Sequence, residues 1–160
     1  MTRIIGGADG PTSVIVGDKN DVYKTCESSL GFKMIYDSSV FEHESEDNTE
    51  RFIYKEVSDM PIYTTVQLFD DMDAQTLSQG LVLQAGNDDV MQYSTRIGAD
   101  GIETKSVYYT KMLNEMQQIF SFHIVDTDKG ALLVETVGYV GQSQKADGKL
   151  EELLASFSVK

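Results

Sequence analysis

Apolar and polar residues alternate with a period of two along most of the chain. Residues 31–37 are the clearest case, because Phe32, Met34 and Tyr36 would share one face of an extended strand while Lys33 points the other way. Similar alternating or β-branched stretches recur at residues 12–17, 51–57, 62–69, 90–98, 102–112, 117–126 and 131–141. The later stretches are joined by only a few residues, which predicts an antiparallel meander and not parallel strands joined by helices.

Two segments repeat their apolar residues every three to four positions instead, which is typical of an amphipathic helix. In residues 70–86, Asp71 or Asp73 is the expected N-cap and Gly86 the expected end. Residues 148–160 are the second helix, whose apolar face needs a sheet to lie on. The apolar positions of the two segments are Ala74, Leu77, Leu81, Val82 and Ala85, and Leu150, Leu153, Leu154 and Phe157.

These elements predict one α+β domain over residues 1–160. Its centre would be an antiparallel sheet of six or seven strands flanked by two or three helices. Residues 20–31 fit either the third, weaker helix or irregular chain. The acidic stretch 42–50 contains no apolar residue, so we expect a mobile, solvated loop there. Residues 1–17 would form an N-terminal hairpin or extension.

The tripeptide Ala-Asp-Gly occurs three times, at residues 8–10, 99–101 and 146–148. Asp-Gly is a strong turn signal, because Asp can hydrogen-bond its own backbone and Gly accepts a positive φ. Each of the three copies therefore predicts a turn.

The chain is strongly acidic, with 26 aspartates and glutamates against 13 lysines and arginines and a net charge of −13. A surface of this sign repels phosphate groups, which argues against nucleic acid and anionic membranes as partners. No run of about 18 apolar residues is present, so membrane insertion is not expected. The N-terminus lacks the apolar core of a signal peptide, and the expected location is therefore the cytoplasm.

Three residues are candidates for chemistry: Cys26, which is the only cysteine, and the two histidines, His43 and His123. In an extended strand His43 would point away from Glu42 and Glu44, which is poor geometry for a metal site. A nucleophile made of Cys26 and a histidine would need a proximity that spacing along the chain cannot demonstrate. The sequence therefore predicts no catalytic residue, no metal site and no cofactor, with Cys26 a buried or incidental thiol.

The opening segment, residues 4–17, reads IIGGADGPTSVIVG. Its glycines at positions 6, 7 and 10 do not have the spacing of either common nucleotide-binding loop. Pro11 removes a backbone N–H donor, and residues 14–16 favour a strand where a phosphate loop would continue into a helix. This spacing excludes a phosphate-binding loop.

Residues 6–13, GGADGPTS, resemble the GGADGPT segment in the β subunits of sodium-ion-translocating decarboxylases, which act on oxaloacetate or methylmalonyl-CoA. In that family the aspartate matched here by Asp9 is associated with the passage of sodium. The resemblance implies that Asp9 and Thr12 supply oxygen ligands for sodium or contact a carboxylate. It covers this short stretch alone.

Over most of the chain, the order of the elements is similar to that of PsbP-like domains, which are α/β/α sandwiches built on an antiparallel sheet. The similarity rests on the opening SLGFKMIYDSSVFE, the turn in RIGADGIETKSVYYT and the final helix LEELLASFSVK. Most proteins of that group are binding or accessory modules and not enzymes, which implies the same for this chain.

The predicted function is thus a non-catalytic accessory or binding domain for a protein partner or a small ligand. The alternative is a soluble relative or subunit of a sodium-pump decarboxylase. In a third interpretation, residues 4–17 form an edge hairpin that pairs between chains and produces a homo-oligomer.

Overall fold

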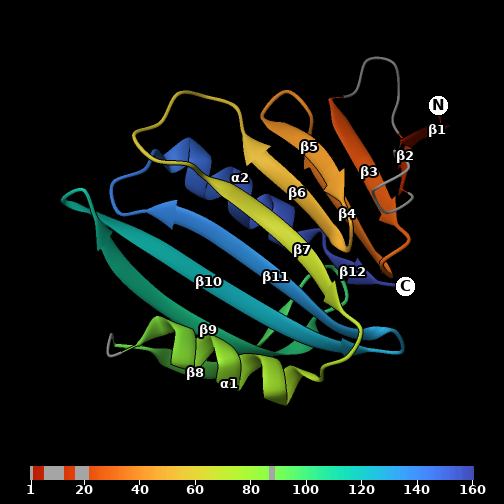
Figure 1. The fold of residues 1–160 in the computed structure, drawn as a ribbon. Coiled ribbons are helices and arrows are strands. Elements are labelled where there is room, and N and C mark those ends of the chain that lie inside the picture. Colours follow the sequence, from red (N-terminus) through yellow and green to blue (C-terminus); the bar gives the residue numbers. More distant parts are fainter. Residues whose placement is uncertain (1, 6–12, 17–21, 87–88) are drawn as a thin grey trace.

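The computed structural model of the chain describes residues 2–5, 13–16, 22–86 and 89–160. These residues form two antiparallel sheets and two helices (Figure 1). The larger sheet has seven strands in the order β5-β6-β7-β11-β10-β9-β8. The smaller sheet has five strands in the order β1-β2-β3-β4-β12, so the N-terminal strands and the C-terminal strand lie in the same sheet.

The seven-stranded sheet is a set of hairpins in which every pair of neighbours is antiparallel. Its strands are β5 (Phe41–Glu46), β6 (Thr49–Tyr54), β7 (Tyr63–Phe69), β8 (Met91–Ile97), β9 (Ile102–Leu113), β10 (Met116–Thr127) and β11 (Gly130–Tyr139). The long β9–β10 hairpin closes through Asn114 and Glu115, whose φ angles are 53° and 66°. Two positive φ angles are typical of a type I′ hairpin turn, whose twist matches that of the flanking strands.

The five-stranded sheet begins with the predicted N-terminal hairpin, since β1 pairs with β2 in antiparallel register and lies at the sheet edge. Its strands are β1 (Thr2–Ile5), β2 (Ser13–Val16), β3 (Tyr23–Ser28), β4 (Phe32–Asp37) and β12 (Ser158–Val159). The predicted face of β4 is confirmed, because Phe32, Met34 and Tyr36 are all buried.

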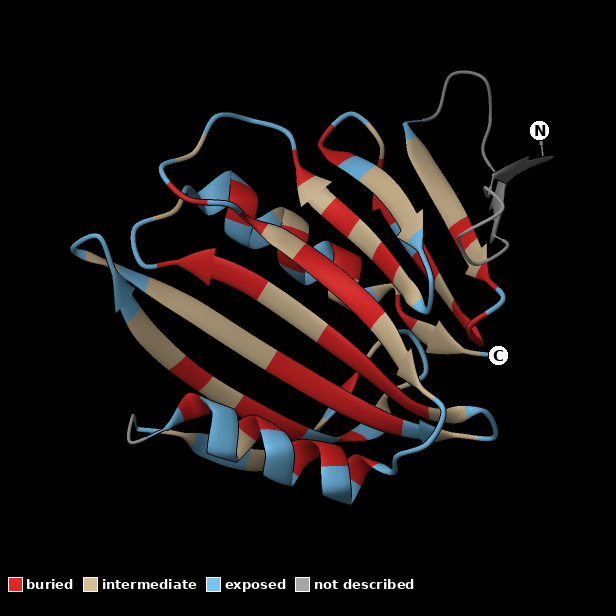
Figure 2. Ribbon diagram, viewed as in Figure 1, coloured by how far each residue is buried: buried red, intermediate tan, exposed pale blue. Residues whose placement is uncertain are grey.

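Two helices cover opposite faces of the seven-stranded sheet (Figure 1). Strand β11 shows why: Leu133 packs in the cluster under α1, whereas Leu132 and Val134 pack in the cluster under α2. A strand whose successive residues point to opposite faces and are all apolar can support a layer on each side. Figure 2 shows the buried residues along this strand and its neighbours. No helix in the described part of the chain is long and apolar enough to cross a membrane.

Both predicted helices are present, with caps that define their ends, but the second does not cover residues 148–160: it starts before residue 148 and stops at Ala155, and Ser158–Val159 form β12. Helix α1 (Ala74–Ala85) begins at Asp73, whose carboxylate accepts a hydrogen bond from the Thr76 backbone N–H, and ends at Gly86 with a positive φ. Helix α2 (Gln144–Ala155) begins at Ser143, whose hydroxyl accepts from the Ala146 N–H. The choice between Asp71 and Asp73 is thereby decided for Asp73.

The α+β class, the antiparallel seven-stranded sheet and the two helices are confirmed, but a second sheet was not predicted. Residues 20–31 supply strand β3 and not a helix, because Tyr23–Ser28 pairs with strands on both sides. The loop expected over residues 42–50 is also wrong. That stretch is most of the β5–β6 hairpin, closed at Asn48, which has a φ of 59°.

The Ala-Asp-Gly prediction is right for one copy and wrong for another. Residues 99–101 lie in the turn between β8 and β9. Residues 146–148 lie inside α2, because the Ser143 cap and the burial of Leu150 and Leu153 outweigh the local turn signal. The third copy, residues 8–10, lies outside the described residues.

Candidate functional site

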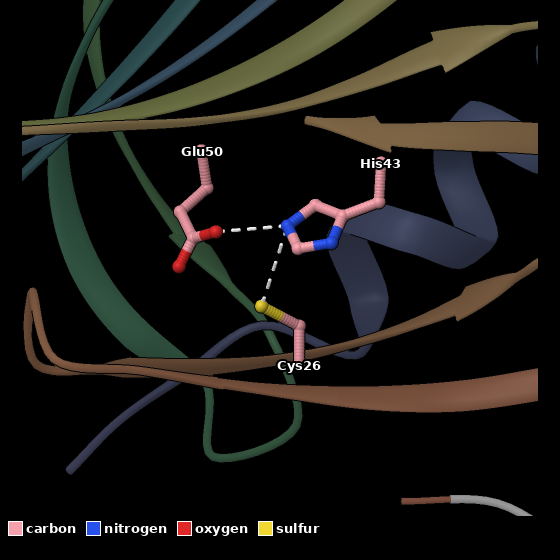
Figure 3. Close-up of side chains that lie close together, drawn as sticks. All are labelled: Cys26, His43 and Glu50. Carbon is pink, nitrogen blue, oxygen red and sulfur yellow. Dashed lines mark hydrogen bonds and ion pairs between the residues drawn. The ribbon is translucent and has the colours of Figure 1, made fainter. Parts of the chain in front are cut away.

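Strand β3 and the β5–β6 hairpin bring Cys26, His43 and Glu50 together between the two sheets (Figure 3). In the hairpin, His43 lies opposite Phe52 and Ser45 lies opposite Glu50, so His43 and Glu50 are diagonal neighbours on one face. The His43 Nε2 atom is 2.8 Å from Glu50 Oε1 and 3.7 Å from Cys26 Sγ. One nitrogen therefore faces both a carboxylate and a thiol.

The cluster lies in the interior. Cys26 and Glu50 have no exposed surface, and 5% of the His43 side chain is exposed. The His43 ring stacks on Phe52 with centroids 4.9 Å apart, and the Tyr36 ring centroid lies 5.5 Å away. Burial, together with the neighbouring Cys26 and Glu50, raises the pKa of Tyr36 to about 12. Its phenol therefore stays protonated, and the cluster is shielded from bulk water.

Glu50 keeps its charge in this interior. Burial by itself would raise the pKa of the carboxyl, but His43 and the hydroxyls of Ser28 and Ser45 together outweigh that effect and lower the pKa. Oε1 accepts hydrogen bonds from both His43 and Ser45. Oε2 is buried and has no hydrogen-bond partner within the described residues, so the Ser28 hydroxyl lies near the carboxylate without satisfying this oxygen. A buried oxygen left in this state costs free energy.

The geometry at His43 does not suit nucleophilic catalysis. In a thiol–imidazole–carboxylate relay, one ring nitrogen accepts from the thiol and the other donates to the carboxylate. Here a single nitrogen, Nε2, serves both neighbours, and it must carry the hydrogen because a carboxylate can only accept. Nε2 consequently has no lone pair with which to take the proton of Cys26.

The second histidine, His123 on β10, lies in a separate buried chain of hydroxyls. Ser106 Oγ is 2.8 Å from His123 Nδ1 and 2.7 Å from Thr104 Oγ1, and the Thr104 hydroxyl donates to the Thr95 carbonyl. Since a hydroxyl has one hydrogen, Thr104 accepts from Ser106, and Ser106 in turn accepts from the Nδ1–H of His123. His123 is therefore not a base for Ser106.

Burial lowers the pKa of His123 to about 4, so the ring is neutral at pH 7. Ser106 also lines a polar hollow of about 260 Å³, together with Tyr93, Lys105 and two residues of α1. Because the Ser106 hydrogen points to Thr104, His123 does not activate the Ser106 hydroxyl in this hollow.

The two binding residues implied by the decarboxylase resemblance, Asp9 and Thr12, lie outside the described residues. The relation to the sodium pumps stays a prediction that rests on residues 6–13.

The spacing along the chain left open whether Cys26 lies near a histidine, and Glu50 was not among the candidate residues. The prediction that His43 points away from Glu42 and Glu44 is correct, but the partners of His43 come from other strands. One signal was available: with a turn at Asn48, the alternation of β5 and β6 places His43 and Glu50 on the same face.

Comparisons with known proteins describe the fold and leave the site unassigned. No protein family matches the chain, and no curated protein matches it either. The fold is similar to that of a crystal structure from Bacteroides thetaiotaomicron VPI-5482 at 1.50 Å resolution, with a TM-score of 0.51 and 16% sequence identity. The match covers 81% of this chain and 45% of that chain, so this chain spans less than half of that protein.

Proposed function

We propose that this protein is a non-catalytic binding domain that holds a small ligand between its two sheets, at Cys26, His43 and Glu50. The observation that carries the proposal is the position of His43 Nε2, which faces the thiol and the carboxylate at once. Three polar groups that converge in a closed interior suit the retention of a ligand, whereas a relay would need them in line.

The fold supports the same proposal. An antiparallel sheet with a helix on each face is compatible with the PsbP-like sandwich that the sequence resembles, and most proteins of that group are binding or accessory modules. We infer that the seven-stranded sheet with α1 and α2 corresponds to that sandwich, and that the five-stranded sheet is an addition which closes the site.

The reactivity of Cys26 tests the non-catalytic part of the proposal. Alkylation by iodoacetamide, followed by mass spectrometry, is expected to be at least about 100-fold slower in the native protein than in the urea-unfolded chain. The reason is that a buried thiol reacts only after an opening that costs a few kcal/mol. Cys26 is the only cysteine, so the unfolded protein is an internal reference for the same residue.

Turnover is the matching measurement. In a panel of ester, amide and thioester substrates, wild type, Cys26→Ser and Ser106→Ala are expected to show the same background rate. A native thiol that reacts as fast as the unfolded one, or a turnover that either substitution abolishes, would overturn the proposal.

A further inference from the structure

The geometry points to the ligand of this cluster: Cys26 Sγ, His43 Nε2 and Glu50 bind one transition-metal ion of the zinc class. The inference rests on the proposed function, because it names what the cluster holds. The three ligand atoms come from three strands and lie within 4.8 Å of one another. Figure 3 shows the thiol and the carboxylate both directed at the Nε2 atom.

The two distances from His43 Nε2 to its neighbours are close to those of a zinc site. Zinc bonds of about 2.0–2.3 Å to oxygen, nitrogen and sulfur place the ligand atoms of a tetrahedron roughly 3.4–3.6 Å apart. The Nε2–Sγ distance is already 3.7 Å, and the Nε2–Oε1 distance of 2.8 Å is that of a hydrogen bond. An ion would take the place of the Nε2 proton, so Nε2 and Oε1 need to separate by only about 0.6 Å.

Glu50 is the independent observation that points to a cation. The residue has no exposed surface and has one oxygen, Oε2, with no hydrogen-bond partner in the described part of the chain. A buried carboxylate is normally satisfied by donors or by a metal, because an unsatisfied one is costly. An ion that both oxygens of the carboxylate bind would satisfy Oε2 as well as Oε1.

The charges also balance. A divalent ion with one thiolate and one carboxylate forms a neutral complex, which is the form that a closed interior tolerates best. When the ion binds, the Cys26 thiol and the Nε2 atom of His43 give up their protons, and the bound imidazole keeps one hydrogen, on Nδ1. No oxidant or further reactant is needed.

The donor set discriminates between metals. Thiolate and imidazole ligands suit zinc and its neighbours, whereas magnesium and calcium prefer oxygen alone. Three protein ligands leave the fourth tetrahedral position for water or a nearby hydroxyl, and Ser28 is buried beside the carboxylate.

The experiment is a metal titration of the chelator-treated, full-length protein. Zn²⁺ is expected to bind with a stoichiometry of one by calorimetry and to raise the melting temperature, while Mg²⁺ does neither. Co²⁺, used as the spectroscopic probe, is expected to give the charge-transfer absorption of a cobalt–thiolate bond.

Three variants and one control identify the ligands. Cys26→Ser is expected to abolish the charge-transfer band, and Cys26→Ser, His43→Gln and Glu50→Gln each to weaken Zn²⁺ binding at least about 10- to 100-fold. His123→Gln changes the other buried histidine and is expected to bind like wild type. If a variant does not fold, the wild type supplies the same information: in moderate urea, Zn²⁺ is expected to protect Cys26 from alkylation.

Two outcomes would overturn the inference. One is that the folded wild type does not bind Zn²⁺. The other is that Cys26→Ser binds Zn²⁺ as tightly as wild type, which would place the ion on the acidic surface. The proposed function is judged separately, by the alkylation and turnover measurements. It stands without a metal if the Cys26 thiol is unreactive and no turnover is found, and it fails if turnover depends on Cys26.

Discussion

Single residues in this protein keep unusual protonation states because of their neighbours. His123 is neutral inside a chain of hydroxyls, and Glu50 is ionised inside a core. Neither state is evident from residue type, since histidine titrates near pH 6.5 and glutamate is normally exposed. Both states affect the stability of the fold as the pH changes.

His123 predicts a loss of stability between pH 6.5 and 4. In this range the unfolded chain binds a proton that the folded ring, with a pKa of about 4, does not accept. The unfolded state is therefore favoured as the pH falls, by up to about 3 kcal/mol at pH 4. Urea unfolding of wild type and His123→Gln at pH 7, 5.5 and 4 measures this effect.

The difference between the two proteins isolates His123 from the other titrating groups. His123→Gln is expected to lose less stability than wild type over this pH range, even if it is less stable at pH 7. If the free energies of unfolding of the two proteins fall in parallel with pH, the His123 ring does not contribute to the pH dependence of stability.

At the scale of elements, turns are positioned by what they touch as well as by their own residues. The β8–β9 turn rests on the C-terminal segment, where the Ala99 N–H donates to the Phe157 carbonyl over 2.9 Å. Gly98 and Gly101 both have a positive φ, of 78° and 61°. A Cβ atom on Gly98 would collide with the Phe157 carbonyl, whereas one on Gly101 would meet open space.

This difference makes a matched pair of substitutions. Gly101→Ala is expected to cost roughly 1 kcal/mol, because the left-handed conformation is unfavourable for alanine. Gly98→Ala should cost about 1–3 kcal/mol more, since the collision with Phe157 is added to the same backbone strain. Denaturant midpoints at constant m-value give the comparison. Equal costs would mean that the turn does not depend on its contact with Phe157.

At the scale of the whole molecule, the two sheets meet across small and polar side chains at β3. The buried residues of this strand are Cys26 and Ser28, which bring little apolar surface to the interface. The contacts of β3 with the β5–β6 hairpin include those of the cluster, whereas β4 supplies the large apolar contact between the sheets through Phe32, Met34 and Tyr36. A metal ion bound at the cluster would add a direct connection between the sheets.

Zn²⁺ is accordingly expected to slow hydrogen exchange locally. Backbone amides of β3 and of the β5–β6 hairpin should exchange at least several-fold more slowly when the ion is bound, because opening the interface would require its release. Helix α1 and strand β9 pack together in the hydrophobic cluster under α1, away from the metal site, so their amides serve as the internal reference. Uniform slowing, or slowing that persists in Cys26→Ser, would contradict this connection between the sheets.

Local periodicity was sufficient for much of the fold. The alternation in 31–37 identified β4 and its buried face, and the three-to-four spacing in 70–86 identified α1 together with both candidate caps. It failed where burial is polar. Strand β3 buries a thiol and a hydroxyl, and residues 42–50 of the β5–β6 hairpin bury a carboxylate and contain no apolar residue. Neither segment showed the apolar alternation on which the method depends, whereas the rest of β6 did.

The sequence by itself determined the α+β class, the antiparallel order of the long hairpins and the two helices. These features follow from interactions between residues close together in the chain, whose pattern a sequence displays directly. Tertiary structure alone decided that a second sheet forms and that Cys26 meets His43 and Glu50. That meeting depends on strand pairing and on the packing of one sheet against another, and a buried charge is stable only where those distant partners supply its hydrogen bonds.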